Sequence, residues 1–287
     1  MNKLPLEKRA AIVRALVEGT SVRGTARMIG VSKDTVLKLL VEVGDFCSIY
    51  QDHRLRDLNT ARVEADEIWA FVGAKQKNAT RQGDGDIWTF TAIDADSKLM
   101  ISWLVGQRNS DSANPFMADV AMRLKNRVQL TTDGHNMYIE AVRKAFTFGR
   151  VDFARLAKSY ATPLDAAGAH RRYSPPVCTG AVKERRVGRP DMDLVSTSFV
   201  ERANLTMRMG MRRFTRLTNA FSKKMENHAH SVALHFMFYN FCRSHATLTK
   251  AAKGIHTSPA MASGLTDHVW KVEEILAMMD GTTLVGE

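Results

Sequence analysis

The stretch ARVEADEIWAFVG, residues 61–73, decides how the middle of this 287-residue chain folds. Many of its residues are aromatic or β-branched, and such residues favour a β-strand. Two more strands are predicted over residues 88–96 and 98–108, and the tight turn at Asp96 and Ser97 predicts that they form a β-hairpin. This part of the chain is therefore expected to begin with three strands.

The chain after the hairpin alternates between helical and extended patterns. Helices are predicted over about 112–126 and 136–146, and strands over 128–134 and 151–161. Three leading strands, followed by strands with helices around them, favour a mixed sheet. The fold class that we expect is therefore α/β.

Two aspartates in these strands are candidates for chemistry. Asp66 lies in the middle of the opening strand, and Asp133 ends a later strand directly before Gly134, where open α/β sheets place functional groups. A buried aspartate is costly unless a cation, a set of donors or a metal ion balances it. Two plainer interpretations stay open, because Asp133 also suits a turn or helix cap and Asp66 also suits the solvent-facing side of an edge strand.

A third carboxylate, Glu201, begins a helical stretch that is otherwise basic. It follows Asp133 by 68 residues, and Asp133 follows Asp66 by 67. Three carboxylates at the ends of separate elements can hold two hard divalent ions, and two such ions can clamp an in-line displacement at phosphorus. Helical spacing puts Asn204 and Arg208 on the same face as Glu201. We therefore take Asp66, Asp133 and Glu201 as candidate catalytic residues and metal ligands.

The net charge of the chain is +11, and the positive charge is concentrated around Glu201. Residues 183–253 hold 14 lysines and arginines and five acidic residues. Such a balance favours a polyanionic partner, nucleic acid first and an anionic membrane surface second. In and beside the Glu201 helix, the candidate DNA contacts are Arg202, Asn204, Arg208, Arg212 and Arg213.

Other properties narrow the class of protein. No apolar run reaches the roughly 18 residues of a membrane-spanning helix, and the first residues have no signal-peptide core. The three cysteines form no paired motif, which argues against a disulfide framework or a zinc ribbon and favours a cytoplasmic protein. The spacing of His228, His235 and Cys242 allows a zinc site, but we prefer to interpret this stretch as a packed helix.

Residues 1–45 form a separate helical module in our interpretation, and residues 46–60 connect it to the rest. The segment RGTARMIGVSKDTVLKLL, which begins at residue 23, resembles a helix-turn-helix with Gly30 at the turn. Its last helix would lie in the major groove of DNA and would expose Lys33 and Lys38 there. A plain three-helix bundle or a protein-interaction module is the alternative.

Four motifs together resemble the transposases of the bacterial insertion-sequence-one family, which are DDE enzymes of the ribonuclease-H-like superfamily. The motifs are ADEIWAFVGAKQKN (65–78), TAIDADSKLMISWLVGQR (91–108), LTTDGHNMYIEAV (130–142) and STSFVERANLTMRMGMRRFTRLTNAFSKK (196–224). The similarity runs from about residue 60 to the end of the stretch YNFCRSHATL. The chain departs from the family at its front, where members often carry a cysteine-rich zinc motif that is not visible here.

The resemblance implies a ribonuclease-H-like core over 61–218 and a helical extension over 219–287. It implies that Asp66, Asp133 and Glu201 form the catalytic triad, with two Mg²⁺ or Mn²⁺ ions as cofactors. The implied reaction is cleavage at insertion-sequence ends, followed by transfer of the 3′-hydroxyl ends into target DNA. The implied partners are DNA and further copies of the chain, and the implied location is the bacterial nucleoid.

Other acids in the same strands compete for these roles. Glu67 is next to Asp66, but the alternation of side chains along a strand puts it on the opposite face. Asp94 and Asp96 fit the end of the hairpin. We therefore prefer Asp66 as the first acid of the triad.

The segment 162–197 is irregular and rich in proline, glycine and arginine. A solvated loop is one interpretation, but the charge favours a DNA-contacting insertion. Its candidate contacts are Arg171, Arg172, Lys183, Arg185 and Arg186. For the whole chain, the alternatives to a transposase are a non-catalytic helix-turn-helix repressor, an inactivated transposase derivative, or a nuclease that cleaves without joining.

Overall fold

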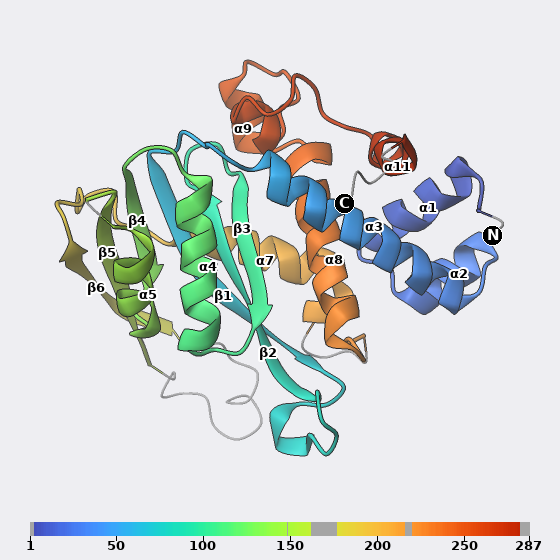
Figure 1. The fold of residues 1–287 in the computed structure, drawn as a ribbon, viewed down its shortest axis with the longest axis horizontal. Coiled ribbons are helices and arrows are strands. Elements are labelled where there is room, and N and C mark those ends of the chain that lie inside the picture. Colours follow the sequence, from blue (N-terminus) through green and yellow to red (C-terminus); the bar gives the residue numbers. More distant parts are fainter. Residues whose placement is uncertain (1–2, 148, 162–176, 216–219, 282–287) are drawn as a thin grey trace.

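The computed structural model of the chain describes residues 3–147, 149–161, 177–215 and 220–281. A six-stranded sheet lies at the centre, with helices on both of its faces (Figure 1). Along the sheet the strands follow the order β3-β2-β1-β4-β5-β6. Their bounds are β1 Arg62–Val72, β2 Gly85–Asp94, β3 Met100–Gly106, β4 Val128–Asp133, β5 Val151–Ala161 and β6 Val177–Val187.

The sheet combines antiparallel and parallel pairing. β3, β2 and β1 are antiparallel neighbours, β1, β4 and β5 are parallel, and β6 is antiparallel to β5. The predicted hairpin of β2 and β3 is present. The mixed α/β class is therefore confirmed, and the strand order is consistent with the ribonuclease-H-like core that the resemblance implies.

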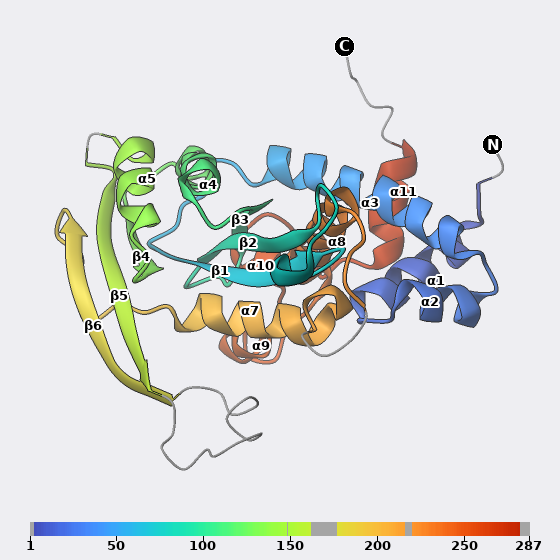
Figure 2. The same ribbon diagram turned by 90° about the horizontal axis from the view of Figure 1, so that it is seen from below.

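Helices cover the two faces of the sheet, and β1 contributes to the core on each side. The covering helices are α4 Ser110–Arg123 and α5 Met137–Ala145 on one face, and α7 Ser198–Gly210 on the other (Figure 2). Val63 and Ala65 belong to the hydrophobic cluster that includes residues of α4 and α5. Ile68 and Ala70 belong to the cluster that includes residues of α7. Side chains at even positions of β1, Asp66 among them, therefore face α7.

The three predicted N-terminal helices are present. Ser21 caps one helix by accepting a hydrogen bond from the Gly24 N–H, and Ser32 caps the next by accepting from the Thr35 N–H. Gly30 ends the middle helix at a φ of 67°, which glycine adopts at low cost. The bounds are α1 Leu6–Val17, α2 Val22–Ile29 and α3 Lys33–Arg54. The helices are confirmed, and their role as a DNA-binding helix-turn-helix stays a prediction.

The third helix is longer than we predicted. α3 continues to Arg54, so most of the connector expected at 46–60 is helical. The buried side chains Val43, Cys47 and Gln51 repeat every four residues, which keeps one face of the helix against the protein interior. The prediction was wrong here because this continuation is short of large apolar residues and rich in polar ones.

A close contact between α3 and the helix α8 (Met225–Met237) explains why the continuation is helical. A Cβ on Gly44 would lie 2.5 Å from the Cβ of His230, so glycine permits the two backbones to approach. Gln51 on α3 donates a 3.2 Å hydrogen bond to the carbonyl oxygen of Ala233 on α8. The helix is thus stabilised by a partner that lies far away in the sequence.

The described C-terminal part of the chain is helical. After α8 come η3 Phe238–Cys242, which is π-helical, and then α9 Ala246–Ala251, α10 Pro259–Ala262 and α11 Val272–Gly281. α11 packs against α1, and Arg9 on α1 forms a 2.5 Å ion pair with Asp280 on α11. In the described part of the chain, no helix is both long enough and apolar enough to span a bilayer.

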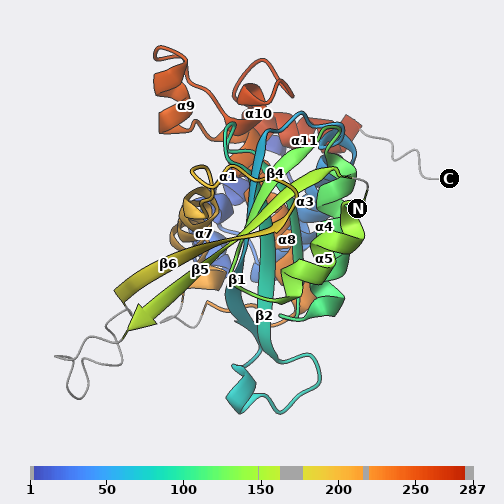
Figure 3. The ribbon, with the colours of Figure 1, turned by 90° about the vertical axis from the view of Figure 1, so that its left-hand side faces the viewer.

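The segment predicted to be irregular, 162–197, contains the strand β6 at 177–187. Figure 3 shows β5 and β6 as a two-stranded ribbon that extends beyond the rest of the sheet. Most side chains of β6 are exposed. The strand was missed because its sequence lacks the apolar alternation that marks a half-buried strand. Residues 162–176 of the segment, with Arg171 and Arg172, lie outside the described residues.

Candidate active site

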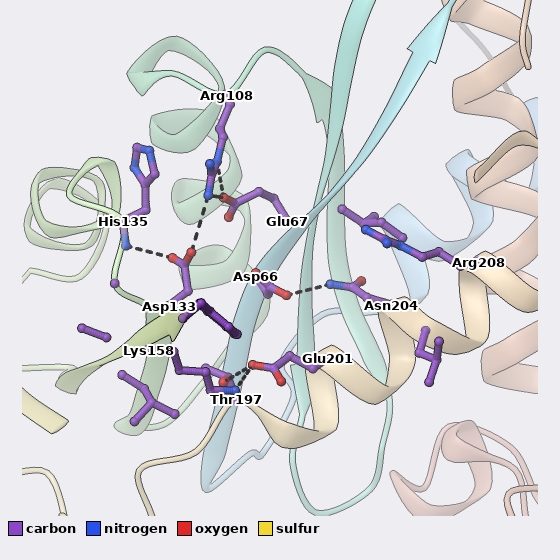
Figure 4. A pocket seen from close by; sticks show the side chains of 16 residues that line it. Asp66, Glu67, Arg108, Asp133, His135, Lys158, Thr197, Glu201, Asn204 and Arg208 are labelled. Carbon is purple, nitrogen blue, oxygen red and sulfur yellow. Dashed lines mark hydrogen bonds and ion pairs between the residues drawn. The ribbon is translucent and has the colours of Figure 1, made fainter. Parts of the chain in front are cut away.

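β1 and β4 separate at the positions of the first two candidate acids. Their parallel pairing stops at Ala65 in β1 and Thr132 in β4. Asp66 and Asp133 are the next residues of the two strands, so they lie side by side where the strands diverge. Both line a cavity of about 630 Å³ between the sheet and α7 (Figure 4). The interpretation of Asp66 as an edge-strand residue is wrong, because β1 lies between β2 and β4.

Three carboxylates cluster at this point. Asp66, Glu67 and Asp133 each offer an oxygen, and these atoms lie within 4.8 Å of one another. Within the described ranges, no other group of acidic, histidine or cysteine side chains is close enough to hold a metal ion. Glu67 starts on the opposite face of β1, as we predicted, and its Oε2 accepts a 2.7 Å hydrogen bond from Tyr138 of α5. It lines the cavity nevertheless, because its longer side chain reaches back to the edge.

Arg108, which follows β3, brings positive charge to the carboxylates. Its guanidinium donates to Glu67 Oε1 at 2.5 Å and lies 3.7 Å from Asp133 Oδ2. It also stacks on Trp88, with its central carbon 4.6 Å from the ring centroid. The side chain of Glu67 is 1% exposed and that of Arg108 is 36% exposed. The buried glutamate therefore holds the arginine at the rim of the cavity.

Asn204 orients Asp66 from the other side of the cavity. Its Nδ2 donates to Asp66 Oδ2 at 3.0 Å, and its Oδ1 accepts from the Thr91 hydroxyl at 3.2 Å. Asn204 is buried, and both the nitrogen and the oxygen of its side-chain amide form hydrogen bonds within the protein. The structure gives this residue a positioning role, and its contact with DNA stays a prediction.

Glu64 positions the helix that carries Asn204. Its carboxylate accepts hydrogen bonds from the backbone N–H groups of Phe199 at 2.7 Å and Val200 at 3.0 Å, in the first turn of α7. An anion at a helix N-terminus satisfies donors that have no partner within the helix and stabilises the helix dipole. Glu64 and Asp66 thus fix α7 against β1 at two points.

Glu201 lies in the first turn of α7 and lines the same cavity. Its Oε1 accepts a 2.6 Å hydrogen bond from Thr197 and forms an ion pair with Lys158 of β5. It is not part of the cluster formed by Asp66, Glu67 and Asp133. The structure therefore brings two of the three predicted acids together and places the third on the opposite wall of the cavity (Figure 4).

The crowding of acids changes their protonation. Burial, followed by the charges of Glu67 and Asp133, raises the pKa of Asp66 to about 7, although the amide of Asn204 acts against this. Burial and the charge of Asp133 also raise the pKa of Glu67, against the effects of Tyr138 and Arg108. Two acids of the cluster therefore hold protons more strongly than free carboxylates do, and a bound cation would relieve the same repulsion.

Asp133 also has the local role that we left open. Its Oδ1 accepts a 3.1 Å hydrogen bond from the backbone N–H of His135, so it stabilises the turn after β4 while it faces the cavity. The competing acids Asp94 and Asp96 lie at the hairpin and not in the cavity. Asp94 accepts from Ser97 at 2.7 Å, and Asp96 pairs with Arg62.

The predicted basic contacts have different positions. Arg208 is half-buried and lines the cavity, whereas Arg213 is half-buried and donates a 2.7 Å hydrogen bond to Ser222. The contact from Arg213 ties its guanidinium to the protein interior, and its contact with DNA stays a prediction. The predicted contacts that are exposed are Lys33, Lys38, Lys183, Arg185, Arg186, Arg202 and Arg212.

The histidines of α8 are structural in this arrangement. His228 is fully buried and its Nδ1 lies 3.0 Å from the hydroxyl of Ser222. His235 is buried as well, and burial lowers its pKa to about 4. These two histidines and Cys242 do not form a metal-binding group among the described residues.

Sequence reasoning missed Glu64, Arg108, Tyr138 and Lys158. Glu64 had a signal, since it precedes Asp66 by two residues and therefore shares its face of the strand. Arg108 is the last residue of the strand predicted over 98–108, which placed it at an end of the hairpin. Nothing in the local sequence of Tyr138 or Lys158 indicated their partners, because those contacts arise only when the strands pair.

No family model matches the chain. No curated protein matches it either. Solved structures that are similar include the Mos1 strand transfer complex, with 16% identity and a TM-score of 0.24, and a pre-cleavage Mos1 transpososome, with 16% identity and a TM-score of 0.20. Each match covers 53% of this chain and about three-fifths of the other, 59% and 60% respectively. Likeness at this level does not establish the fold or the activity of the chain.

Proposed function

We propose that the chain is a DNA transposase that cleaves the ends of an insertion sequence and joins the freed 3′-hydroxyls to target DNA. The observation that carries the proposal is the meeting of Asp66 and Asp133 where β1 and β4 diverge. Glu201, the third acid that the resemblance to the insertion-sequence-one transposases implies, lies on the facing wall of the same cavity. The basic surface around α7 suits a phosphate backbone.

The donor set fits a hard divalent cation. The clustered groups are carboxylates, and oxygen ligands of this kind suit Mg²⁺ or Mn²⁺ rather than zinc or copper. Asp66 and Asp133 would hold such ions, with Glu201 as the third ligand of the proposed triad. When bound, two ions supply activation of the attacking oxygen and stabilisation of the leaving oxygen.

The residues around the acids have separate tasks in this proposal. Asn204 keeps one oxygen of Asp66 oriented toward α7. Lys158 and Arg208 line the cavity and attract the phosphate group of the scissile bond. Arg108 balances the charge of Glu67, and its guanidinium nitrogen lies 3.7 Å from Asp133 Oδ2. The chain thus positions and orients a phosphodiester without a covalent nucleophile.

Glu67 is the alternative to Glu201 as the third acid. It is already in the carboxylate cluster, whereas Glu201 is paired with Lys158. Against this, both oxygens of Glu67 accept hydrogen bonds, one from Arg108 and one from Tyr138. We therefore keep Glu201 as the ligand and assign Glu67 to the support of Arg108.

The wider setting follows from the same proposal. Joining two ends in one event requires more than one active site, so we expect a homo-oligomer on DNA. The partners are the ends of the element and the target DNA, and the location is the bacterial cytoplasm at the nucleoid. The helix-turn-helix formed by α2 and α3 would help to find the ends, through Lys33 and Lys38.

The test is strand cleavage and joining on a labelled duplex that carries the element's own ends. The full-length protein is incubated with Mg²⁺, with Mn²⁺ or with EDTA, beside Asp66→Ala, Asp133→Ala, Glu201→Ala and Glu67→Ala. We expect metal-dependent joined products, lost in the first three variants while DNA binding is retained. Loss in Glu67→Ala with full activity in Glu201→Ala would exchange the roles of the two glutamates.

Two other outcomes would replace the proposal. Cleaved ends without joined products, under every metal tested, would make the protein a nuclease. Binding to the ends without any cleavage would favour a helix-turn-helix repressor or an inactivated transposase derivative.

A further inference from the structure

A second cavity lies between the N-terminal helices and the end of α7. Its volume is about 700 Å³. One wall comes from α1, α2 and the first turns of α3, and the other from the turn η2 (Arg212–Phe214), residues of 220–223 and one side of α8 along most of its length. We call it the interdomain groove. It does not share a lining residue with the cavity that contains Asp66, Asp133 and Glu201, which we call the acidic cavity.

The groove carries positive charge only. Five of its lining side chains are basic and none is acidic among those described: Arg23, Lys33, Arg212, Arg213 and Lys223. Arg213 is used by Ser222, but the other four have no ion-pair partner within the described residues. Unpaired cations on both walls of a cleft focus a positive potential into it. The complementary partner is therefore a polyanion and not an acidic side chain of this protein.

α7 connects the groove with the acidic cavity. Its first half carries Glu201 and Asn204, which line the cavity, and Arg212 follows shortly after its last residue and lines the groove. Figure 2 shows α7 running from the side of β5 toward α1 and α2. At that end Gly19, in the turn between α1 and α2, abuts the helix, since a Cβ there would lie 2.9 Å from the carbonyl oxygen of Gly210.

The length of α7 sets the spacing between the two sites. Gly210, the last residue of α7, follows Glu201 by nine residues, which is roughly 14 Å at about 1.5 Å per residue, and Arg212 lies two residues further on in the turn η2. Base pairs of B-DNA are about 3.4 Å apart, so the spacing equals about five base pairs. A duplex with its end in the acidic cavity would therefore pass the groove about five base pairs from that end.

We propose that the interdomain groove binds the phosphate backbone of the duplex end, about five base pairs from the bond that the acidic cavity cleaves. The proposal rests on the proposed function, and it adds a DNA-binding surface with a defined spacing, in which Arg23 and Lys223 join Lys33 and Arg212. Contacts of this kind set the register of the duplex and carry no base specificity. The groove thus determines which bond reaches the carboxylates.

The test measures binding of a labelled duplex end to the full-length protein in EDTA, so that cleavage does not occur. The variants are Lys33→Gln, Arg212→Gln and the double variant, with Lys144→Gln as the matched control because Lys144 is exposed on α5, across the sheet from α7. We expect the double variant to bind about tenfold more weakly, and the slope of log affinity against log salt to fall by roughly 0.9 for each phosphate that is no longer neutralised. Arg212→Lys should restore the slope, and Lys144→Gln should leave it unchanged.

The position at which the groove meets the duplex is tested with DNA that carries one neutral methylphosphonate at successive positions. The wild type should bind more weakly when the neutral group is about five base pairs from the end, and the double variant should show no further weakening there. Unchanged affinity and slope in the double variant, or sensitivity at other positions alone, would overturn the inference. A wild-type protein that binds and cleaves the ends under those results would keep the proposed function, whereas one that does not bind DNA would remove both.

Discussion

The acidic cavity and the interdomain groove are similar in size and opposite in construction. Their volumes are about 630 and 700 Å³, and α7 connects them. In the cavity Asp66, Glu67 and Asp133 each accept a hydrogen bond from a neighbour. In the groove Arg23, Lys33, Arg212 and Lys223 have no ion-pair partners within the described residues. One region is built to hold groups in fixed positions, and the other offers positive charge that a partner can use.

The difference has an energetic meaning. Like charges that are held together and partly buried oppose each other, so the cavity reduces the stability of the fold in the absence of a cation. Solvated basic side chains in a cleft cost little and can follow a flexible backbone. The acidic cavity, as a site for chemistry, therefore needs preorganised side chains. The groove, as a site for attachment, needs less preorganisation.

The largest effect is expected at the cavity. Asp66→Asn or Asp133→Asn should reduce metal-dependent DNA cleavage at least about 1,000-fold, because each removes a ligand from a site whose main task is charge stabilisation. Binding of DNA in EDTA should change less than about threefold, since the groove is intact. Comparing cleavage rates with anisotropy titrations checks both points. If binding and cleavage fall together, the separation of the two regions is wrong.

Glu67 should matter more for stability than the exposed cations of the groove. Glu67→Gln is expected to lower the free energy of unfolding by about 1–3 kcal/mol, because it weakens the contacts with Arg108 and Tyr138 at a side chain that is 1% exposed. Arg212→Gln should change it by less than about 0.5 kcal/mol, as is usual for an exposed residue. Urea unfolding followed by circular dichroism measures both. Equal effects would mean that the cavity is not preorganised.

Gly44→Ala should damage the groove and spare the cavity. The new Cβ would meet His230 at 2.5 Å, so α3 and α8, which form opposite walls of the groove, must move apart. We expect a loss of about 1–3 kcal/mol in unfolding free energy and weaker DNA binding. Mn²⁺ affinity should remain as in the wild type. Gly281, the last residue of α11, is a useful contrast, because no atom lies within 4 Å of a Cβ added there and its φ is not positive.

A dependence of stability on pH is also expected, and it should belong to the cavity alone. The pKa of Asp66 is about 7 in the folded protein and about 3.9 in an unfolded chain. The folded state therefore binds more protons between these values, and the metal-free protein should lose stability as pH rises from about 4 to about 7. Asp66→Asn should reduce this dependence, as measured by thermal unfolding at several pH values in EDTA. An identical pH profile for the wild type and the variant would contradict it.

The sequence predicted the first five strands because their signals are local. β1, β2 and β3 are marked by their composition and by a tight turn, and Asp133 before Gly134 marks the end of β4. β6 could not be predicted, since most of its side chains are exposed and its only strand partner among the described residues is β5. The extension of α3 to Arg54 was missed because it depends on a contact with α8, far along the chain.

The site was predictable to a similar degree. Asp66 and Asp133 were both singled out from the sequence, but their meeting depends on two strands that become parallel neighbours, and we did not predict that pairing. The separate position of Glu201 could not be predicted, because its partner Lys158 comes from β5 and is brought near only by the sheet. We did not predict that Glu67 would join Asp66 and Asp133. The alternation of side chains along a strand gives the direction of each Cβ atom and not the reach of a long side chain.

The most direct test of the central claim is a titration of Mn²⁺ into the metal-free protein, followed by calorimetry or electron paramagnetic resonance. The wild type and Arg212→Gln should bind the ion with the same affinity, whereas Asp66→Asn and Asp133→Asn should bind it at least about tenfold more weakly. That result would place the cation at the carboxylates where β1 and β4 diverge. Binding by the wild type that is unchanged in both aspartate variants would contradict the account.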